Sequence, residues 1–151
     1  MPRPPRVQSP GHYHVTTRGN DGATIYLNDI DRNVFLGLVD RVAEDCEWSL
    51  HAWCLMTNHF HLLVEIPTEN LAAGMHRLNG VYARWFNDRH GRTGHLFERR
   101  YWATRVEGDE HLETTVQYVL NNPVQAGLCA NPFKWPWLGG PLVDAARPAD
   151  E

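Results

Sequence analysis

Residues 48–66, WSLHAWCLMTNHFHLLVEI, contain the pattern that decides the fold. Trp48 to Met56 and His59 to Ile66 are both rich in aromatic, branched and other apolar side chains, and Thr57-Asn58 separates them. Two such runs around a short polar break are typical of antiparallel strands joined by a tight turn. The sequence therefore predicts a β-hairpin in the middle of the chain.

The second predicted strand carries a pair of histidines on one face. Its opposite face is apolar without interruption and is expected to be the buried one: Phe60, Leu62, Val64 and Ile66. Because side chains two apart on a strand point to the same side, His59 and His61 project together, about 6–7 Å apart. Two imidazoles on one face can bind a divalent metal with little rearrangement. A pair of half-exposed strand histidines without a ligand fits the same pattern.

Outward from the hairpin, the sequence predicts strands and helices in alternation. The predicted elements are, in chain order, a strand over 12–18, a helix beginning at Asn28 or Asp29, the hairpin, a helix from Pro67-Thr68 to Gly91, a strand over 96–106, and a helix over 109–121 that Pro123 stops. This β-α-β-β-α-β-α order predicts an α+β fold, a ferredoxin-like antiparallel sheet with helices packed on one face.

Length and composition limit the chain to one ordinary globular domain. It has 151 residues, of which 42% are hydrophobic and 21% charged, close to the average for folded proteins. We expect an irregular arm over residues 1–11, a folded domain over 12–128 and an irregular tail over 129–151. No apolar run approaches the ~20 residues needed to span a bilayer, and the first residues do not resemble a secretory signal. Three cysteines without CxxC spacing favour a reduced, cytoplasmic protein, in which Cys54 is a buried apolar residue.

The basic residues are mostly arginines, and they are concentrated. The net charge of −4 argues against a protein that coats nucleic acid indiscriminately. Half of the basic residues lie in one window with few acids: Arg77, Arg84, Arg89, Arg92, Arg99, Arg100 and Arg105. Aromatic residues alternate with them, as in proteins that bind phosphates and stack on bases. A solvated helix face above core aromatics is the alternative interpretation.

A second cluster lies near the end of the last predicted helix. Residues four apart share a helix face, so Tyr118 and Asn122 present a phenol and a carboxamide to one spot. A tyrosine can act as a covalent nucleophile if its phenolate is stabilised. A core tyrosine beside a helix-terminal amide is the alternative.

Four segments together resemble one known family. Met56 to Val64, MTNHFHLLV, resembles the histidine-hydrophobe-histidine motif of the single-tyrosine HUH transposases, and Tyr118 to Gly127, YVLNNPVQAG, resembles their tyrosine helix. Tyr13 to Asn20 and Gly94 to Arg100 resemble further family segments, in the same order. Over nearly the whole chain the sequence is most similar to the REP-associated tyrosine transposases, the branch linked to repetitive extragenic palindromes in bacterial genomes.

The resemblance implies a role for each of these residues. His59, His61 and Asn122 would bind a divalent metal, Mg²⁺ or Mn²⁺, and Tyr118 would be the nucleophile that forms a 5′-phosphotyrosine bond. Residues 12–128 would then be the catalytic domain, and the enzyme would cleave and rejoin single-stranded or hairpin DNA as a monomer or homodimer. The arginine window, with Arg3, Arg6, Arg18 and Asn20, would contact that DNA. The remaining histidines are expected to be structural or surface residues: His12, His14, His51, His76, His90, His95 and His111.

Two other classes of function remain open from the sequence. A non-catalytic nucleic-acid-binding module would use the same arginines and aromatics. A metal-dependent nucleotide phosphohydrolase would use the histidine pair, although Leu63 stands where a histidine-triad hydrolase would have its third alternating histidine.

Overall fold

A computed structural model of the chain describes residues 8–149, so Arg3, Arg6 and most of the predicted arm lie outside the described residues. One five-stranded sheet has the order β4-β1-β3-β2-β5, and all neighbouring strands are antiparallel. The strands are β1 (Gly11–Arg18), β2 (Ser49–Leu55), β3 (His59–Ile66), β4 (Trp102–Val106) and β5 (Leu138–Gly139). The helices are α1 (Asp29–Cys46), α2 (Leu71–His90), α3 (Asp109–Gln125) and α4 (Pro141–Ala146), with 3₁₀ turns η1 (Asn20–Gly22) and η2 (Pro132–Lys134).

The first four strands confirm the predicted ferredoxin-like arrangement. Helix α1 connects β1 to β2, and β3 lies between these two strands and antiparallel to both, which is the split β-α-β topology. Of the two candidates for the start of this helix, Asn28 and Asp29, it is Asn28 that caps α1, by accepting a hydrogen bond from the backbone N–H of Asp31. Gly91 ends α2 in the left-handed conformation (φ 61°), which glycine adopts without strain.

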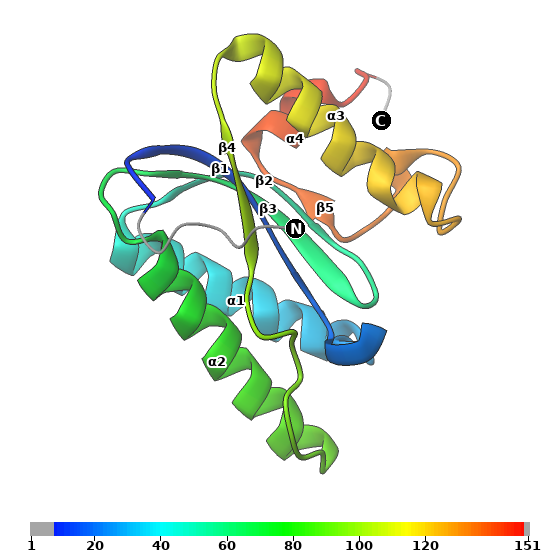
Figure 1. The fold of residues 1–151 in the computed structure, drawn as a ribbon. Helices are drawn as coiled ribbons and strands as arrows, with labels where there is room; N and C mark the ends of the chain where they lie inside the picture. Colours follow the sequence, from blue (N-terminus) through cyan, green and yellow to red (C-terminus); the bar gives the residue numbers. More distant parts are fainter. Residues whose placement is uncertain (1–7, 150–151) are drawn as a thin grey trace.

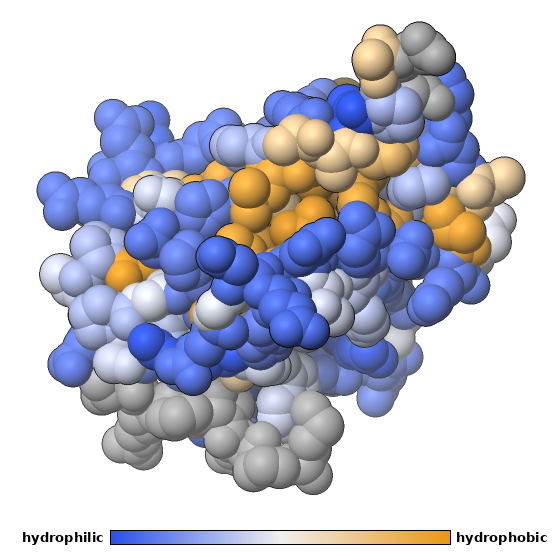
Figure 2. Space-filling model, turned by 90° about the horizontal axis from the view of Figure 1, so that it is seen from above, coloured by the Kyte–Doolittle hydropathy of each residue, from blue (hydrophilic) through white to orange (hydrophobic). Residues whose placement is uncertain are grey.

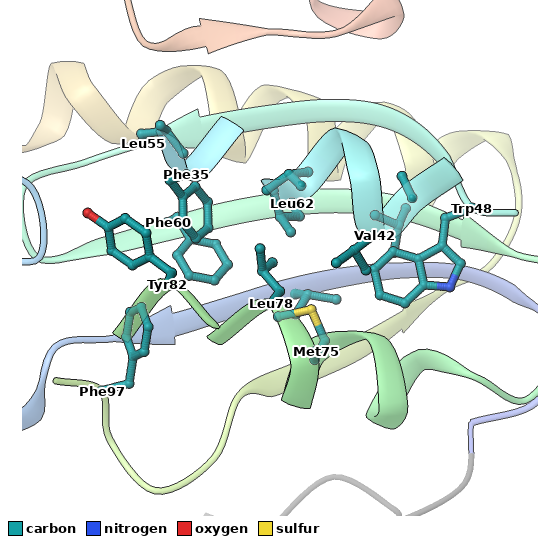
Figure 3. Close-up of a cluster of buried hydrophobic side chains, with 14 of the residues drawn as sticks. Phe35, Val42, Trp48, Leu55, Phe60, Leu62, Met75, Leu78, Tyr82 and Phe97 are labelled. Atoms are coloured by element: carbon teal, nitrogen blue, oxygen red, sulfur yellow. The ribbon is translucent and has the colours of Figure 1, made fainter. Parts of the chain in front are cut away.

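The main core lies between the sheet and the pair α1 and α2 (Figures 1 and 3). It is centred on aromatic rings from three elements: Phe35 lies 4.6 Å from Phe60 and 5.1 Å from Tyr82 between ring centroids. Phe60, Leu62, Val64 and Ile66 are all buried, as their alternation predicted. Burying rings of this size supplies most of the free energy that holds the two helices on the sheet.

The sheet is covered on both faces, not on one as expected from the sequence. Figure 1 shows α1 and α2 on one side of the sheet and α3 and α4 on the other. A second buried cluster joins Leu63 and Cys54 of the sheet to Val119 of α3 and Val143 of α4. From the α3–α4 side, an apolar strip is visible between hydrophilic side chains (Figure 2). The histidine-bearing face of β3 is therefore partly buried.

Three predicted boundaries are wrong. Helix α3 continues through Pro123 to Gln125, because Pro123 is buried and the backbone N–H groups of residues 126–128 bond to the last turn. The strand predicted over 96–106 begins only at Trp102, although Phe97 forms an isolated bridge with Gly19. The tail is not irregular: residues 132–146 form η2, β5 and α4, since Leu138 pairs with Cys54 and Val143 is buried on the second face.

Cys54 is buried, as expected, and Cys46, Cys54 and Cys129 are free cysteines in the structure. No helix within residues 8–149 combines the length and apolar character needed to cross a membrane.

Candidate active site

The structure brings the two predicted clusters together. His59 and His61 lie at the start of β3, where β3 leaves the hairpin turn, and their rings are 5.0 Å apart in an edge-to-face arrangement. Tyr118 and Asn122 lie one turn apart on α3, which crosses the same face of the sheet. The Tyr118 ring is 5.8 Å from the His61 ring, and Asn122 Oδ1 is 3.5 Å from His59 Nε2. The strand histidines and the helix side chains thus form one site.

Hydrogen bonds fix which His59 nitrogen faces the site. The carboxamide oxygen of Asn58 can only accept, and it lies 2.8 Å from His59 Nδ1, so this nitrogen carries the proton. In the neutral ring His59 Nε2 then presents a lone pair toward Asn122. The turn residue Asn58 therefore orients the first imidazole of the site.

The Asn122 side chain is oriented by its own helix. Its Nδ2 donates to the backbone carbonyl of Tyr118 at 3.3 Å, which leaves Oδ1 directed at His59. Two lone-pair atoms, His59 Nε2 and Asn122 Oδ1, thus face each other across 3.5 Å. Two ligands of one first-row ion lie about 3.0–3.4 Å apart when the metal–ligand bonds are ~2.1 Å long. The 3.5 Å separation of this pair is close to the spacing expected for two ligands that share a cation.

His61 adds a third donor, and His14 holds it in place. His61 Nδ1 lies 2.9 Å from His14 Nε2, and the two rings stack at 5.1 Å. His61 is only 4% exposed, yet its Nε2 has no hydrogen-bond partner among the described residues. A buried nitrogen without a partner is costly unless a ligand satisfies it. Like His59 Nε2 and Asn122 Oδ1, it is suited to a metal ion.

The three histidines of the site are neutral near pH 7. Burial, together with the neighbouring His14 and His59, lowers the pKa of His61 to about 3. Burial also lowers the pKa of His14 to about 4 and shifts that of His59 downward. Neutral imidazoles are the form that binds metals, so no proton has to leave the site when a cation enters. The donor set therefore fits a divalent metal.

The site is open on the side where a substrate would enter. Tyr118 is 52% exposed, with its ring edge-to-face against both His14 and His61. Beside His59 a cavity of about 260 Å³ lies between the hairpin turn, the η1 segment and the chain after α3. The phenol of Tyr118 and the His59 side of the site are therefore accessible from solvent.

His14, which the sequence pattern puts among the structural and surface histidines, lies in the site against His61. A signal for it exists in the alternation of β1: His14 and Thr16 share one face, and the antiparallel register puts Thr16 opposite His61. The pairing of β1 with β3 is needed to use that signal, since the sequence alone does not fix which strands are neighbours.

The arginines of the 77–105 window do not form one continuous face. Arg77 pairs with Asp45 at 2.7 Å between α2 and α1, and Arg89 lies 3.9 Å from the buried Asp31. Arg105 is held at the β4 edge by Glu107 and the Tyr13 hydroxyl, both at 2.8 Å.

The other arginines of the window, and Arg18, are more available to a ligand. Arg99 and Arg100 line a groove between α2 and residues 94–101, while Arg84 is exposed and Arg92 bonds to Asn87. Arg18 is exposed and lies opposite His59 in the strand register, and Asn20 is exposed in η1. Arg18 is therefore the basic residue nearest to the histidine pair in the strand pairing.

The proteins to which the chain is similar are transposases, enzymes that cleave and rejoin DNA, and the chain is a transposase too. A site that combines a tyrosine with two histidines and an asparagine is consistent with this class. The sequence pattern of the family described as "Transposase IS200 like" matches residues 8–122, which include every residue of the site. The chain belongs to this IS200-like transposase family.

Individual relatives agree with the family. A protein of Haemophilus influenzae (strain Rd), named as a candidate REP-associated tyrosine transposase, is 25% identical over 138 residues, 84% of this chain and 78% of that protein. The solved structure of a REP-associated tyrosine transposase bound to a REP hairpin matches 91% of this chain and 81% of that chain, with a TM-score of 0.75 and 16% identity. A candidate transposase of Deinococcus radiodurans R1 matches 81% of this chain and 97% of its own, with a TM-score of 0.54 and 17% identity. These two structures share the fold.

Proposed function

We propose that this transposase cleaves and rejoins single-stranded or hairpin DNA through a covalent bond between Tyr118 and a 5′-phosphate. The observation that carries the proposal is the convergence of the Tyr118 ring with three potential ligand atoms, His59 Nε2, His61 Nε2 and Asn122 Oδ1. Such a site can hold a phosphate beside a nucleophile, whereas a module that only binds nucleic acid needs no donor set of this kind.

In the proposed reaction the Tyr118 oxygen attacks the scissile phosphorus and loses its proton. A Tyr118–phosphate bond forms while the bond from phosphorus to the 3′-oxygen breaks, and the 3′-oxygen leaves as a hydroxyl. One phosphodiester replaces another, so no nucleotide cofactor is required. Attack by a different 3′-hydroxyl reverses the step and joins two strands.

The remaining side chains orient these partners. His59, His61 and Asn122 would hold Mg²⁺ or Mn²⁺, which when bound would supply a Lewis acid for the charge that develops on the phosphate. Asn58 and His14 keep the two imidazoles turned toward the site. Arg18, next to His59 in the strand register, would attract the phosphate electrostatically.

Hairpin DNA is the favoured substrate because the relative with a TM-score of 0.75 was solved with a REP hairpin. A protein that acts on chromosomal DNA would work in the cytoplasm. Arg99 and Arg100 line the groove beside α2 and would contact the backbone there. We expect Arg99→Ala to weaken binding and to reduce the slope of log K against log salt by about 0.7 per lost phosphate contact on a single strand.

The decisive experiment is trapping of the covalent adduct. The protein is incubated with labelled single-stranded hairpin oligonucleotides and Mn²⁺, and the products are separated on a denaturing gel and identified by mass spectrometry. We expect a protein–DNA adduct at Tyr118 that Tyr118→Phe abolishes, while DNA binding by this variant persists.

Tyr26→Phe is the matched control, because the Tyr26 hydroxyl is buried and lacks a hydrogen-bond partner among residues 8–149. It should form the adduct normally. Full cleavage by Tyr118→Phe would refute the tyrosine mechanism. Turnover of mononucleotides without an adduct would instead identify a phosphohydrolase.

A further inference from the structure

At the opposite end of the histidine-bearing sheet face, three other side chains converge from three strands. His12 lies on β1, His51 on β2 and Glu65 on β3. Glu65 Oε1 is 3.1 Å from His51 Nε2 and 3.5 Å from His12 Nε2, and potential ligand atoms of all three lie within 4.8 Å of one another. Glu65 is four residues along β3 from His61, about 13 Å, so this cluster is separate from the candidate active site.

A β-bulge gives His51 its position. The register of β2 against β3 shifts between Leu50 and Ala52, so His51 is the extra residue of β2. In a regular strand His51 would lie opposite Leu63, but the bulge puts Ala52 there and leaves His51 free to reach Glu65. Bulges commonly redirect a side chain in this way. The His51 ring stacks on that of His12, with centroids 5.2 Å apart and 26° between the ring planes.

The chemistry of the three donors defines the ligand they suit. Two imidazoles and one carboxylate form a common ligand set for Zn²⁺ and similar first-row ions, whereas Mg²⁺ prefers oxygen ligands alone. The carboxylate–imidazole separations of 3.1 and 3.5 Å match the spacing of ligands that share one ion with bonds of ~2.1 Å. All three side chains are partly exposed, so an ion can enter from solvent and keep water in its remaining positions.

We propose that His12, His51 and Glu65 form a second metal site, which binds a Zn²⁺-like cation and links β1, β2 and β3 at the end of the sheet far from the active site. Such a link stabilises the folded chain, because the unfolded chain does not hold the three ligands together. The proposal does not depend on the reaction assigned to Tyr118.

The test uses tag-free protein in which the active-site histidines are replaced, His59→Ala with His61→Ala, so that only the second site remains. Isothermal titration with Zn²⁺ should give one ion per chain, against two in the unmodified protein. At a Zn²⁺ concentration about 100 times the dissociation constant, the thermal midpoint should rise by about 5–10 °C.

Adding His51→Ala or Glu65→Gln to that background should weaken Zn²⁺ binding at least about 10–100-fold. Loss of a side chain that only hydrogen-bonds to a metal ligand already weakens metal binding by this factor, and loss of a ligand should weaken it at least as much. The matched control is His76→Ala, an exposed histidine on α2, which should leave binding unchanged. Circular dichroism of each variant without metal reports whether it is folded. Absence of Zn²⁺ binding in the folded background protein would overturn the proposal and leave a hydrogen-bonded cluster only. Binding that survives both His51→Ala and Glu65→Gln would overturn it equally, because the ion would then sit elsewhere.

Discussion

Replacing His14 by phenylalanine tests whether the second strand histidine is oriented by its neighbour. His14→Phe keeps an aromatic ring against His61, where the two rings now stack at 5.1 Å, but removes the nitrogen that lies 2.9 Å from His61 Nδ1. His61 is then a buried imidazole whose Nδ1 has lost its hydrogen-bond partner, and no other hydrogen bond from the described residues orients the ring. We expect the folded enzyme to bind Mn²⁺ more weakly.

The size of the effect follows from the role of the lost contact. Partners that orient a metal-binding histidine contribute about 10–100-fold to metal affinity, or about 1.4–2.7 kcal/mol. The buried Nδ1 without a partner costs the folded protein a further ~1–3 kcal/mol, which lowers its thermal midpoint by several degrees. Tyr118 and Asn122 are unchanged, so the rate at saturating Mn²⁺ should stay close to that of the unmodified enzyme.

The assay measures adduct formation over a range of Mn²⁺ concentrations. The concentration that gives half-maximal adduct should rise about 10–100-fold in His14→Phe and remain unchanged in His111→Phe, a replacement of an exposed histidine in the first turn of α3. A half-maximal concentration within twofold of the unmodified enzyme, in a folded variant, would refute the assignment of His14 as a positioning residue.

Three further predictions concern the fold that supports the site. Gly74→Ala would place a Cβ in steric conflict with the buried Trp48 ring and should lower the free energy of unfolding by about 1–3 kcal/mol. Gly80→Ala in the same helix meets nothing described within 4 Å and should raise that free energy by about 0.5–1 kcal/mol. Asp31→Ala removes a fully buried carboxylate that accepts hydrogen bonds from the Leu27 backbone and His90, and should lower the same free energy by roughly 3 kcal/mol in urea denaturation. Burial raises the pKa of Cys54 to about 12, so its thiol should resist iodoacetamide at pH 8 in the folded protein and react once the protein is unfolded in urea.

The raised pKa of Cys54 also predicts the direction in which the stability of the folded protein changes with pH. Because the pKa of the folded-state thiol is the higher one, stability is independent of this group well below its ordinary pKa of about 8.5, at which half of the unfolded thiol is ionised. Stability should then fall by up to about 1.4 kcal/mol per pH unit as the pH rises from about 9 to 12.

Alkylation of folded protein at Cys54 at pH 8 would contradict the assigned burial. Equal free energies of unfolding for Gly74→Ala and Gly80→Ala would contradict the close packing of Gly74 on Trp48. A free energy of unfolding that Asp31→Ala leaves unchanged would show that the buried carboxylate does not stabilise the fold.

The sequence by itself determined the parts of the protein that depend on short-range periodicity. Alternation along residues 59–66 identified both the buried face and the shared face of His59 and His61, because a strand repeats every two residues. Helical spacing likewise put Tyr118 and Asn122 on one face of α3. Asn28 and Gly91 marked helix ends because capping is a local interaction.

Tertiary structure alone decided which of these faces meet. Pairing of β1 with β3 carried His14 to His61, and packing of α3 across the second sheet face carried Asn122 to His59. That packing also overrode the local preference of Pro123 to end its helix and ordered the tail as β5 and α4. The physical reason is that the free energy of burying apolar surface depends on the total area buried and not on sequence separation. A local pattern therefore identifies which face of a helix or strand is apolar, but not which other element will cover that face.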